Sequence, residues 1–161
     1  MRPVYLDYNA TAPARPEVKA ALTAALDLPG NASSVHGPGR RARHVVEDAR
    51  DAVAALVGAR REEVVFTAGG TESNNTALRG SGRARLLASA GEHDSVLRAA
   101  GVETVPLTRD GLVDLTRLAA MLAADERPAL VSVMLANNET GAIQPVAEVA
   151  RITHAHGGLV H

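Results

Sequence analysis

The run ALVSVML at residues 129–135 constrains the fold of this chain more than any other stretch of its sequence. It is continuously apolar apart from one serine, so it has no polar face to turn toward water. Such a run is typical of a strand buried on both faces, as strands are in parallel sheets covered by helices. The run therefore predicts an α/β domain around it.

Predicted strands and helices alternate from residue 63 onward. Strands are predicted at 63–68, 84–89, 102–107 and 129–135, another starts at 157–161, and helices are predicted at 71–79, 93–100, 114–124 and 145–156. Asp114 is placed to cap the third of these helices, and Asp94 or Ser95 the second. The alternation predicts an α/β fold with a mainly parallel sheet and flanking helices. Because the last strand stops after a few residues, we expect the chain to be incomplete.

The first part of the chain is predicted to be less regular. Residues 2–8 form a short β-like run, and residues 16–28 predict a helix that begins with proline. A loop rich in Pro, Gly, Asn and Ser follows at 29–39. A second helix is predicted from Arg40 to Gly58, because glycine suits a helix end.

Charge and composition exclude several classes of partner. The net charge is −1, from 17 basic and 18 acidic residues, which gives no electrostatic reason to expect nucleic acid or an acidic membrane surface. No apolar run approaches the ~20 residues of a membrane-spanning helix. The first residues have no apolar signal-peptide core, so a cytoplasmic location is expected. The chain has no cysteine, which excludes disulfides, thiolate metal sites and thiol nucleophiles within it.

The stretch VVFTAGGTESNNTAL at 64–78 joins a predicted strand to a predicted helix through two glycines. The first N–H groups of a helix have no internal partner and attract anions. Gly69 and Gly70 permit positive φ and close approach of a ligand, and Thr71 adds a hydroxyl donor. A phosphate would fit, and a turn that uses glycine only for its geometry is the alternative. Since nucleotide-binding glycine motifs are not completed, the phosphate is not expected to belong to a nucleotide.

Two further polar clusters follow predicted strands. His93 comes just after the strand at 84–89, and Asn138 lies in ANNETG, just after the strand at 129–135. Ligands of open parallel sheets bind outside the carboxyl ends of the strands. We therefore expect Gly70, Thr71, His93 and Asn138 to converge on one cavity. The alternatives are a surface or capping histidine and an ordinary Asn-rich turn.

Five stretches together resemble a known family. They are VYLDYNATAP (4–13), GNASSVHGPGR (30–40), VVFTAGGTESNN (64–75), GEHDSVL (91–97) and VSVMLANNETGAIQP (131–145). In this order they are similar to the amino-terminal part of the cysteine desulfurases, which are pyridoxal-phosphate enzymes of the class V aminotransferase group. The resemblance implies that the α/β domain is part of the large domain of the fold type I pyridoxal-phosphate enzymes.

The resemblance also implies roles for four residues. Gly70 and Thr71 would bind the phosphate of pyridoxal 5'-phosphate. His93 would stack on the pyridine ring and assist proton transfer, as the one catalytic residue in this region. Asn138 would bind the phenolic oxygen of the ring. Residues 1–15 would lie near the active site, and residues 16–161 would form an incomplete cofactor-binding domain.

The implied reaction removes sulfur from L-cysteine. An enzyme cysteine attacks the substrate sulfur, which gives L-alanine and an enzyme persulfide. The sulfur would pass to an acceptor or scaffold protein for iron–sulfur cluster assembly or tRNA thiolation, and the complete enzyme would be a homodimer. The family's cofactor-binding lysine and active-site cysteine come later in its sequence. Lys19, the only lysine here, has no motif match, so these 161 residues alone are expected to be unstable and inactive.

Three alternatives remain. One is another enzyme of the same group, such as a selenocysteine lyase or a kynureninase-like enzyme. Another is a module without catalytic activity that keeps the anion site for binding. The third is a metal site at His154, His156 and His161, which is not favoured because the first two point ~200° apart on a helix.

Overall fold

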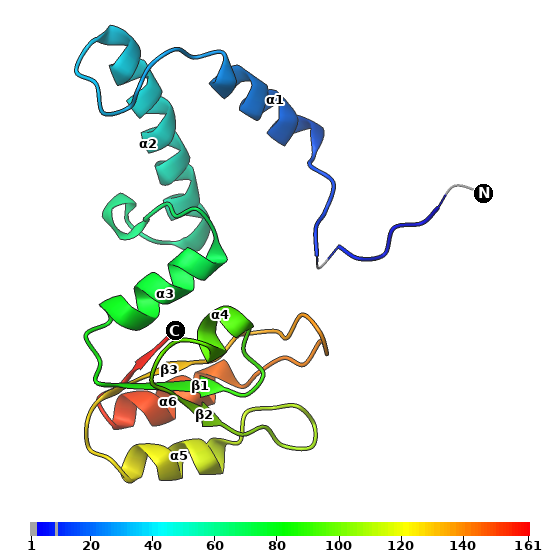
Figure 1. Cartoon of the computed structure of the whole chain (residues 1–161), viewed down its shortest axis with the longest axis vertical. Coiled ribbons are helices and arrows are strands. Elements are labelled where there is room, and N and C mark those ends of the chain that lie inside the picture. Colours follow the sequence, from blue (N-terminus) through cyan, green and yellow to red (C-terminus); the bar gives the residue numbers. More distant parts are fainter. Residues whose placement is uncertain (1–2, 9) are drawn as a thin grey trace. The chain divides into compact units, whose positions relative to one another are not determined.

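The computed structural model describes residues 3–8 and 10–161 of the chain, which divides into two compact units, Met1–Phe66 and Thr67–His161 (Figure 1). The roles predicted for residues 1–15 and 16–161 stay predictions. In the described part of the chain, no helix combines the length and the apolar character needed to cross a bilayer.

In its described residues, the first unit contains helices and loops but no strand. The helices are α1 (Pro16–Leu26), α2 (Gly37–Val57) and the short 3-10 helix η1 (Arg61–Glu63). Helix α1 begins at the predicted proline, and Gly58 ends α2 with φ 68°, as predicted. Helix α2 begins before the predicted Arg40, because the Nδ1 atom of His36 accepts a hydrogen bond from Gly39 N–H at 3.2 Å and caps it.

The β-like run predicted at 2–8 is wrong over its described residues, and the strand predicted at 63–68 is wrong. Residues 3–8 form no strand, and Arg2 lies outside the described residues. Residues 63–68 also lie outside any sheet. A strand needs a ladder partner, whereas here the Val64 carbonyl accepts a hydrogen bond from the Arg50 guanidinium. That guanidinium also lies 4.9 Å from the centre of the Phe66 ring, so the segment is bound to α2.

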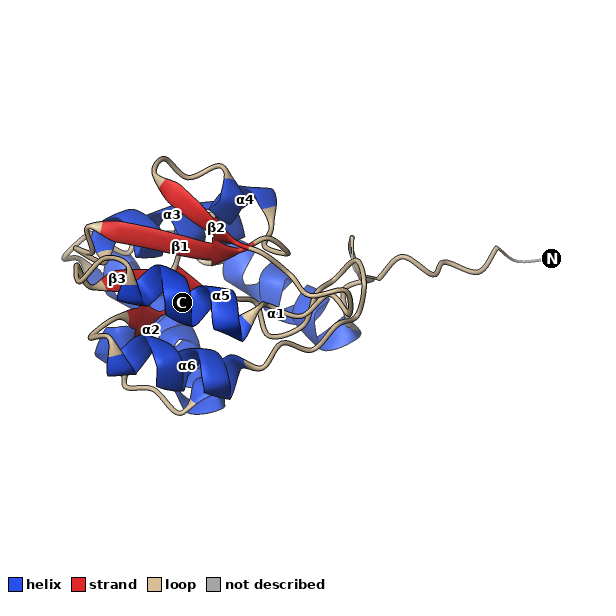
Figure 2. Ribbon diagram, turned by 90° about the horizontal axis from the view of Figure 1, so that it is seen from below, coloured by secondary structure: helices blue, strands red, loops and turns tan. Residues whose placement is uncertain are grey.

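The second unit is built around a four-stranded parallel sheet (Figure 2). Its strands are β1 (Arg85–Ser89), β2 (Val102–Val105), β3 (Ala129–Ser132) and β4 (Leu159–Val160), in the order β2-β1-β3-β4. Its helices are α3 (Gly70–Gly80), α4 (Asp94–Leu97), α5 (Leu115–Ala123) and α6 (Val146–Ala155). The predicted α/β fold with a parallel sheet and flanking helices is confirmed.

Both faces of the sheet are covered. On one face, Leu87 and Val131 pack with Leu118 of α5 and Val149 of α6. On the other face, Ala88 and Leu130 pack with Leu78 of α3 and Val96 of α4. All four residues of β3 are buried, as the apolar run predicted.

Capping residues account for the starts of two of these helices. The Asp114 carboxylate accepts hydrogen bonds from the N–H groups of Thr116 and Arg117, both at 3.0 Å, which confirms the predicted cap of α5. Helix α4 is capped by His93, and the predicted caps Asp94 and Ser95 are wrong. The imidazole Nδ1 atom accepts the N–H bond that a shorter carboxylate or hydroxyl usually takes.

Candidate functional site

The strand order places a crevice between β1 and β3. From β1 the chain passes through α4 to β2 on one side, and from β3 it passes through α6 to β4 on the other. The connections thus leave the neighbouring strands β1 and β3 in opposite directions, which makes a switch point in the sheet. Open α/β sheets bind ligands at the carboxyl edge of such a switch point. The loops that start there are 90–93 and 133–145, which contain His93 and Asn138.

Two side chains hold these loops together. The Glu92 carboxylate accepts a hydrogen bond from Met134 N–H. Asn137 donates from Nδ2 to the Gly91 carbonyl at 2.9 Å, while its Oδ1 accepts from the backbone N–H groups of its own loop. The loop after β1 is therefore fixed against the loop after β3. Sequence analysis did not single out either residue for this role.

Glu92 is half-buried between the loops. Burial raises the pKa of its carboxyl group, against the opposing effects of the Met134 N–H and of the imidazoles of His161 and His93. His161 is itself positioned by a 3.0 Å hydrogen bond between its Nδ1 and the hydroxyl of buried Ser132. The crevice between β1 and β3 thus contains a carboxyl group that can titrate, that of Glu92, beside the polar residues of the two loops.

The start of α3 has no side-chain cap. Gly69 is extended, with φ 169°, and Gly70 is the first helical residue, so the predicted use of positive φ is wrong at both. Close approach remains possible, because a Cβ atom added to either glycine would meet no atom within 4 Å. The Glu72 carboxylate, in the same turn, accepts from Ala68 N–H at 2.6 Å. The start of α3 is therefore open to a ligand on the side of its two glycines.

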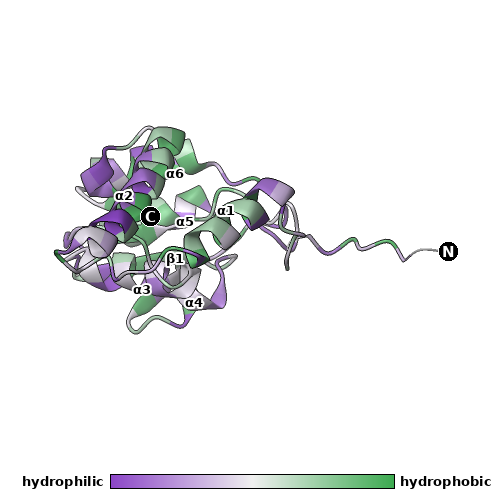
Figure 3. Ribbon diagram, turned by 90° about the horizontal axis from the view of Figure 1, so that it is seen from above, coloured by the Kyte–Doolittle hydropathy of each residue, from purple (hydrophilic) through white to green (hydrophobic). Residues whose placement is uncertain are grey.

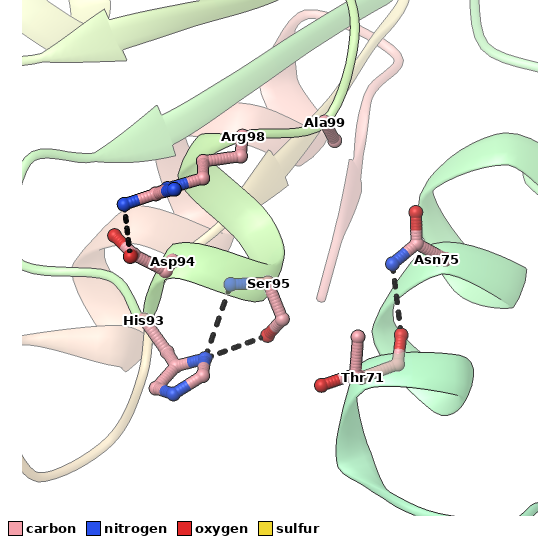
Figure 4. Close-up of a pocket in the computed structure, with 7 residues that line it drawn as sticks. All are labelled: Thr71, Asn75, His93, Asp94, Ser95, Arg98 and Ala99. Atoms are coloured by element: carbon pink, nitrogen blue, oxygen red, sulfur yellow. Dashed lines mark hydrogen bonds and ion pairs between the residues drawn. The ribbon is translucent and has the colours of Figure 1, made fainter.

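Thr71 and His93 line one cavity of about 350 Å³ (Figure 4). In the close-up, Thr71 and Asn75 of α3 face the start of α4, where His93 and Ser95 lie. The cavity also contains Arg98, whose guanidinium is 2.7 Å from the Asp94 carboxylate. Arg98 was not predicted, since an exposed arginine on a short helix carries no motif signal.

Asn138 lines a second cavity of about 250 Å³, together with Gly91, Glu92 and Glu139. His93 and Asp94 belong to both cavities. The structure therefore places Thr71, His93 and Asn138 on two cavities that meet at His93, and not on the single cavity that was predicted. Gly70 precedes Thr71 in the chain and lines neither.

Among the described residues, no three His, Cys, Asp or Glu side chains gather in a group that could hold a metal ion. The site offers helix N–H groups that no described side chain caps, a threonine hydroxyl and an imidazole at a sheet edge. These features, at the carboxyl edge of an α/β sheet, suit an anionic ligand.

The family follows from comparison with known proteins. The model of the aminotransferase class-V family matches residues 4–161, and the chain belongs to this family. An IscS-like cysteine desulfurase of Mycobacterium tuberculosis is 41% identical over 98% of this chain. The matched region is 44% of that relative, so the chain spans less than half the length of the curated relatives it matches.

Solved structures agree on the fold. A NifS-like protein from Rickettsia africae superposes with a TM-score of 0.89 and 34% identity, over 98% of this chain and 46% of that one. A structure described as SspA in complex with cysteine superposes with a TM-score of 0.86 and 28% identity, over 98% of this chain and 49% of that one.

Proposed function

We propose that this chain is the amino-terminal region of a pyridoxal-phosphate-dependent cysteine desulfurase. The observation that carries the proposal is the uncapped start of α3, whose Thr71 shares a cavity with His93. It supports the proposal because the N–H groups at a helix start attract a phosphate, and the Mycobacterium tuberculosis relative is an IscS-like cysteine desulfurase.

The residues present fit the cofactor. The N–H groups of Gly70 and Thr71 and the Thr71 hydroxyl would bind its phosphate. His93 would stack on the ring and assist proton transfer, and Asn138 would bind the phenolic oxygen. When bound, pyridoxal phosphate supplies an electron sink for the bonds broken at the substrate.

The substrate proposed is L-cysteine. A solved relative is described in complex with cysteine, which supports this choice. The complete protein would pass sulfur to an acceptor or scaffold protein and would act as a homodimer. The Arg98–Asp94 pair lies in the same cavity, where a substrate carboxylate could compete for the guanidinium.

The test is a chimera in which residues 1–161 replace the matching part of the Mycobacterium tuberculosis relative. We expect it to bind pyridoxal phosphate and to release alanine from L-cysteine. Thr71→Val should weaken binding of pyridoxal phosphate but not of pyridoxal, because only the former has a phosphate. Thr76→Val, on the exposed side of the same helix, is the control.

His93→Ala in the same chimera tests the catalytic role. General acid–base groups contribute ~10²–10⁴-fold to rate. The rate of alanine release should therefore decrease by a factor in that range, while the absorbance of the bound cofactor is retained. A folded chimera that binds the cofactor but releases no alanine would refute the proposed activity. Unchanged turnover after His93→Ala would refute the role of His93.

A further inference from the structure

We infer that Asn74 and Ser95 are positioning residues that hold His93 in one tautomer, with Nδ1 as acceptor and the proton on Nε2. The inference rests on the proposed function for its use in catalysis, but its geometry stands independently. Asn74 and Ser95 act through His93, because the hydrogen bonds that they donate run toward Nδ1 of its ring.

The first observation is the main-chain donor at Nδ1. The N–H of Ser95 donates to Nδ1 of His93 at 3.1 Å, as the cap of α4. A backbone amide can only donate, so Nδ1 must offer a lone pair. Of the two neutral tautomers, only the one with the proton on Nε2 satisfies this bond.

The second observation is a chain of side-chain donors from α3. Asn74 donates from Nδ2 to the Ser95 hydroxyl oxygen at 2.8 Å, and that oxygen lies 2.9 Å from Nδ1 of His93. Because Nδ1 is an acceptor, the Ser95 hydroxyl donates to it in this contact while accepting from Asn74. Successive bonds in one direction strengthen one another.

Packed helices hold this relay in place. Leu78 of α3 and Val96 of α4 lie in the same buried cluster against the sheet. Asn74 is one turn before Leu78, and Ser95 is next to Val96, so both polar residues are fixed by neighbours in the core. In the described part of the chain, the hydrogen bonds of the His93 ring all go to Nδ1.

The consequence concerns the atom that meets a ligand. His93 lines both cavities of the site, and Nε2 is the ring nitrogen that is left for a ligand. In the locked tautomer this atom is a hydrogen-bond donor. His93 therefore meets the ligand as a donor at a defined atom, and Asn74 and Ser95 determine which atom that is.

The direct test is nitrogen-15 NMR of the imidazole in the full chain. We expect a pyridine-type shift for Nδ1 and a pyrrole-type shift for Nε2. Asn74→Asp is the sharpest variant, because a carboxylate only accepts and would turn the Ser95 proton away from His93. It should move both ring shifts part of the way toward the averaged values of an exposed histidine, as should Ser95→Ala, while the Ser95 N–H still donates to Nδ1.

Matched variants separate the relay from other effects. Thr76→Asp places the same new charge on the exposed side of α3 and should leave both ring shifts unchanged. Ser95→Thr keeps the hydroxyl and should restore the wild-type shifts. A protonated Nδ1 in the wild type, or identical shifts in wild type and Asn74→Asp, would overturn the inference.

The chimera gives a second readout. Loss of one hydrogen bond to His93 should lower kcat by about 2–10-fold in Ser95→Ala, with KM and cofactor affinity unchanged. Ser95→Thr should recover the rate. If the chimera releases no alanine, the proposed function fails, while the ring shifts still decide the tautomer.

Discussion

The two units of this chain contain similar aliphatic residues but bury them to very different extents. In the second unit, strands and helices bury two apolar clusters on the two faces of a sheet. In the described part of the first unit, only Gly39 and Ala54 are buried, and Leu56 is 84% exposed. The hydropathy colouring shows green apolar residues on α1, where none is buried (Figure 3).

A sequence can predict a helix correctly without providing a hydrophobic core for it. Both units contain helices that follow an N-cap residue, such as α2 after His36 and α5 after Asp114. Among the described residues, only the second unit forms a sheet, which presents two apolar surfaces against which helices can pack. Burial of that apolar area, and not helix propensity, is the main source of helix stability in proteins.

The largest expected effect comes from the core of the second unit. Leu87 is fully buried in β1, so Leu87→Ala should lower the free energy of unfolding by ~2–5 kcal/mol. Leu56→Ala in the first unit is the matched control, with a change within ~0.5 kcal/mol. Urea unfolding followed by circular dichroism measures both. Equal losses would contradict the difference between the units.

A smaller effect is expected at a tight backbone contact of α2. A Cβ atom at Gly39 would lie 2.4 Å from the Ser34 carbonyl oxygen, so Gly39→Ala should cost ~1–3 kcal/mol locally. At Gly37 the nearest atom would be the flexible Arg41 guanidinium at 3.7 Å, and Gly37→Ala is the control. Hydrogen exchange should quicken around residues 30–45 for Gly39→Ala alone. Unaltered exchange would show that this loop is not held by the contact.

Helix caps allow a comparison between the units. Asp114 accepts two N–H bonds, and Asp114→Ala should cost ~0.5–2 kcal/mol. His36 accepts one, at 3.2 Å, so His36→Ala should cost less. Thermal unfolding with circular dichroism ranks the two variants. A larger loss for His36→Ala would reverse the expected order.

The smallest effect concerns pH. Because burial raises the pKa of Glu92, the folded state binds its proton more tightly than the unfolded state does. Stability should therefore fall as pH rises from the ordinary carboxyl range through the raised pKa. Glu92→Gln keeps an acceptor for Met134 N–H and should remove this part of the pH dependence.

The measurement is the difference in unfolding free energy between wild type and Glu92→Gln across that pH range. The variant should gain relative stability as pH increases. Glu62→Gln, on the exposed 3-10 helix of the first unit, controls for the loss of one carboxylate. A difference that is flat with pH, or that grows in the opposite direction, would contradict the buried position of Glu92.

Sequence patterns predicted most of the second unit because its signals are local. The apolar run at 129–135 and the Asp114 cap depend on residues close together in the chain. The strand predicted at 63–68 failed because a β-branched run does not say what it pairs with. The order β2-β1-β3-β4 was equally beyond the sequence, since it is decided by packing of distant segments.

For the candidate site too, some features could be predicted from the sequence and others could not. His93 and Asn138 could be placed at one sheet edge because the carboxyl ends of parallel strands share that edge. The contacts that position them could not be predicted: Glu92 meets Met134, and Asn74 meets Ser95, across long stretches of chain. Their side chains carry no signal until the fold brings them together.

The parallel pairing of all four strands has a consequence for how the second unit forms. Parallel neighbours cannot be joined by a tight hairpin, so the sheet has no local pair from which to start. Its central ladder joins Leu86 to Leu130, and the whole of β2 and α5 lies between them. The entropy of closing that loop must be overcome before the ladder stabilises anything. Refolding should therefore show a fast helical phase, followed by slow acquisition of the sheet.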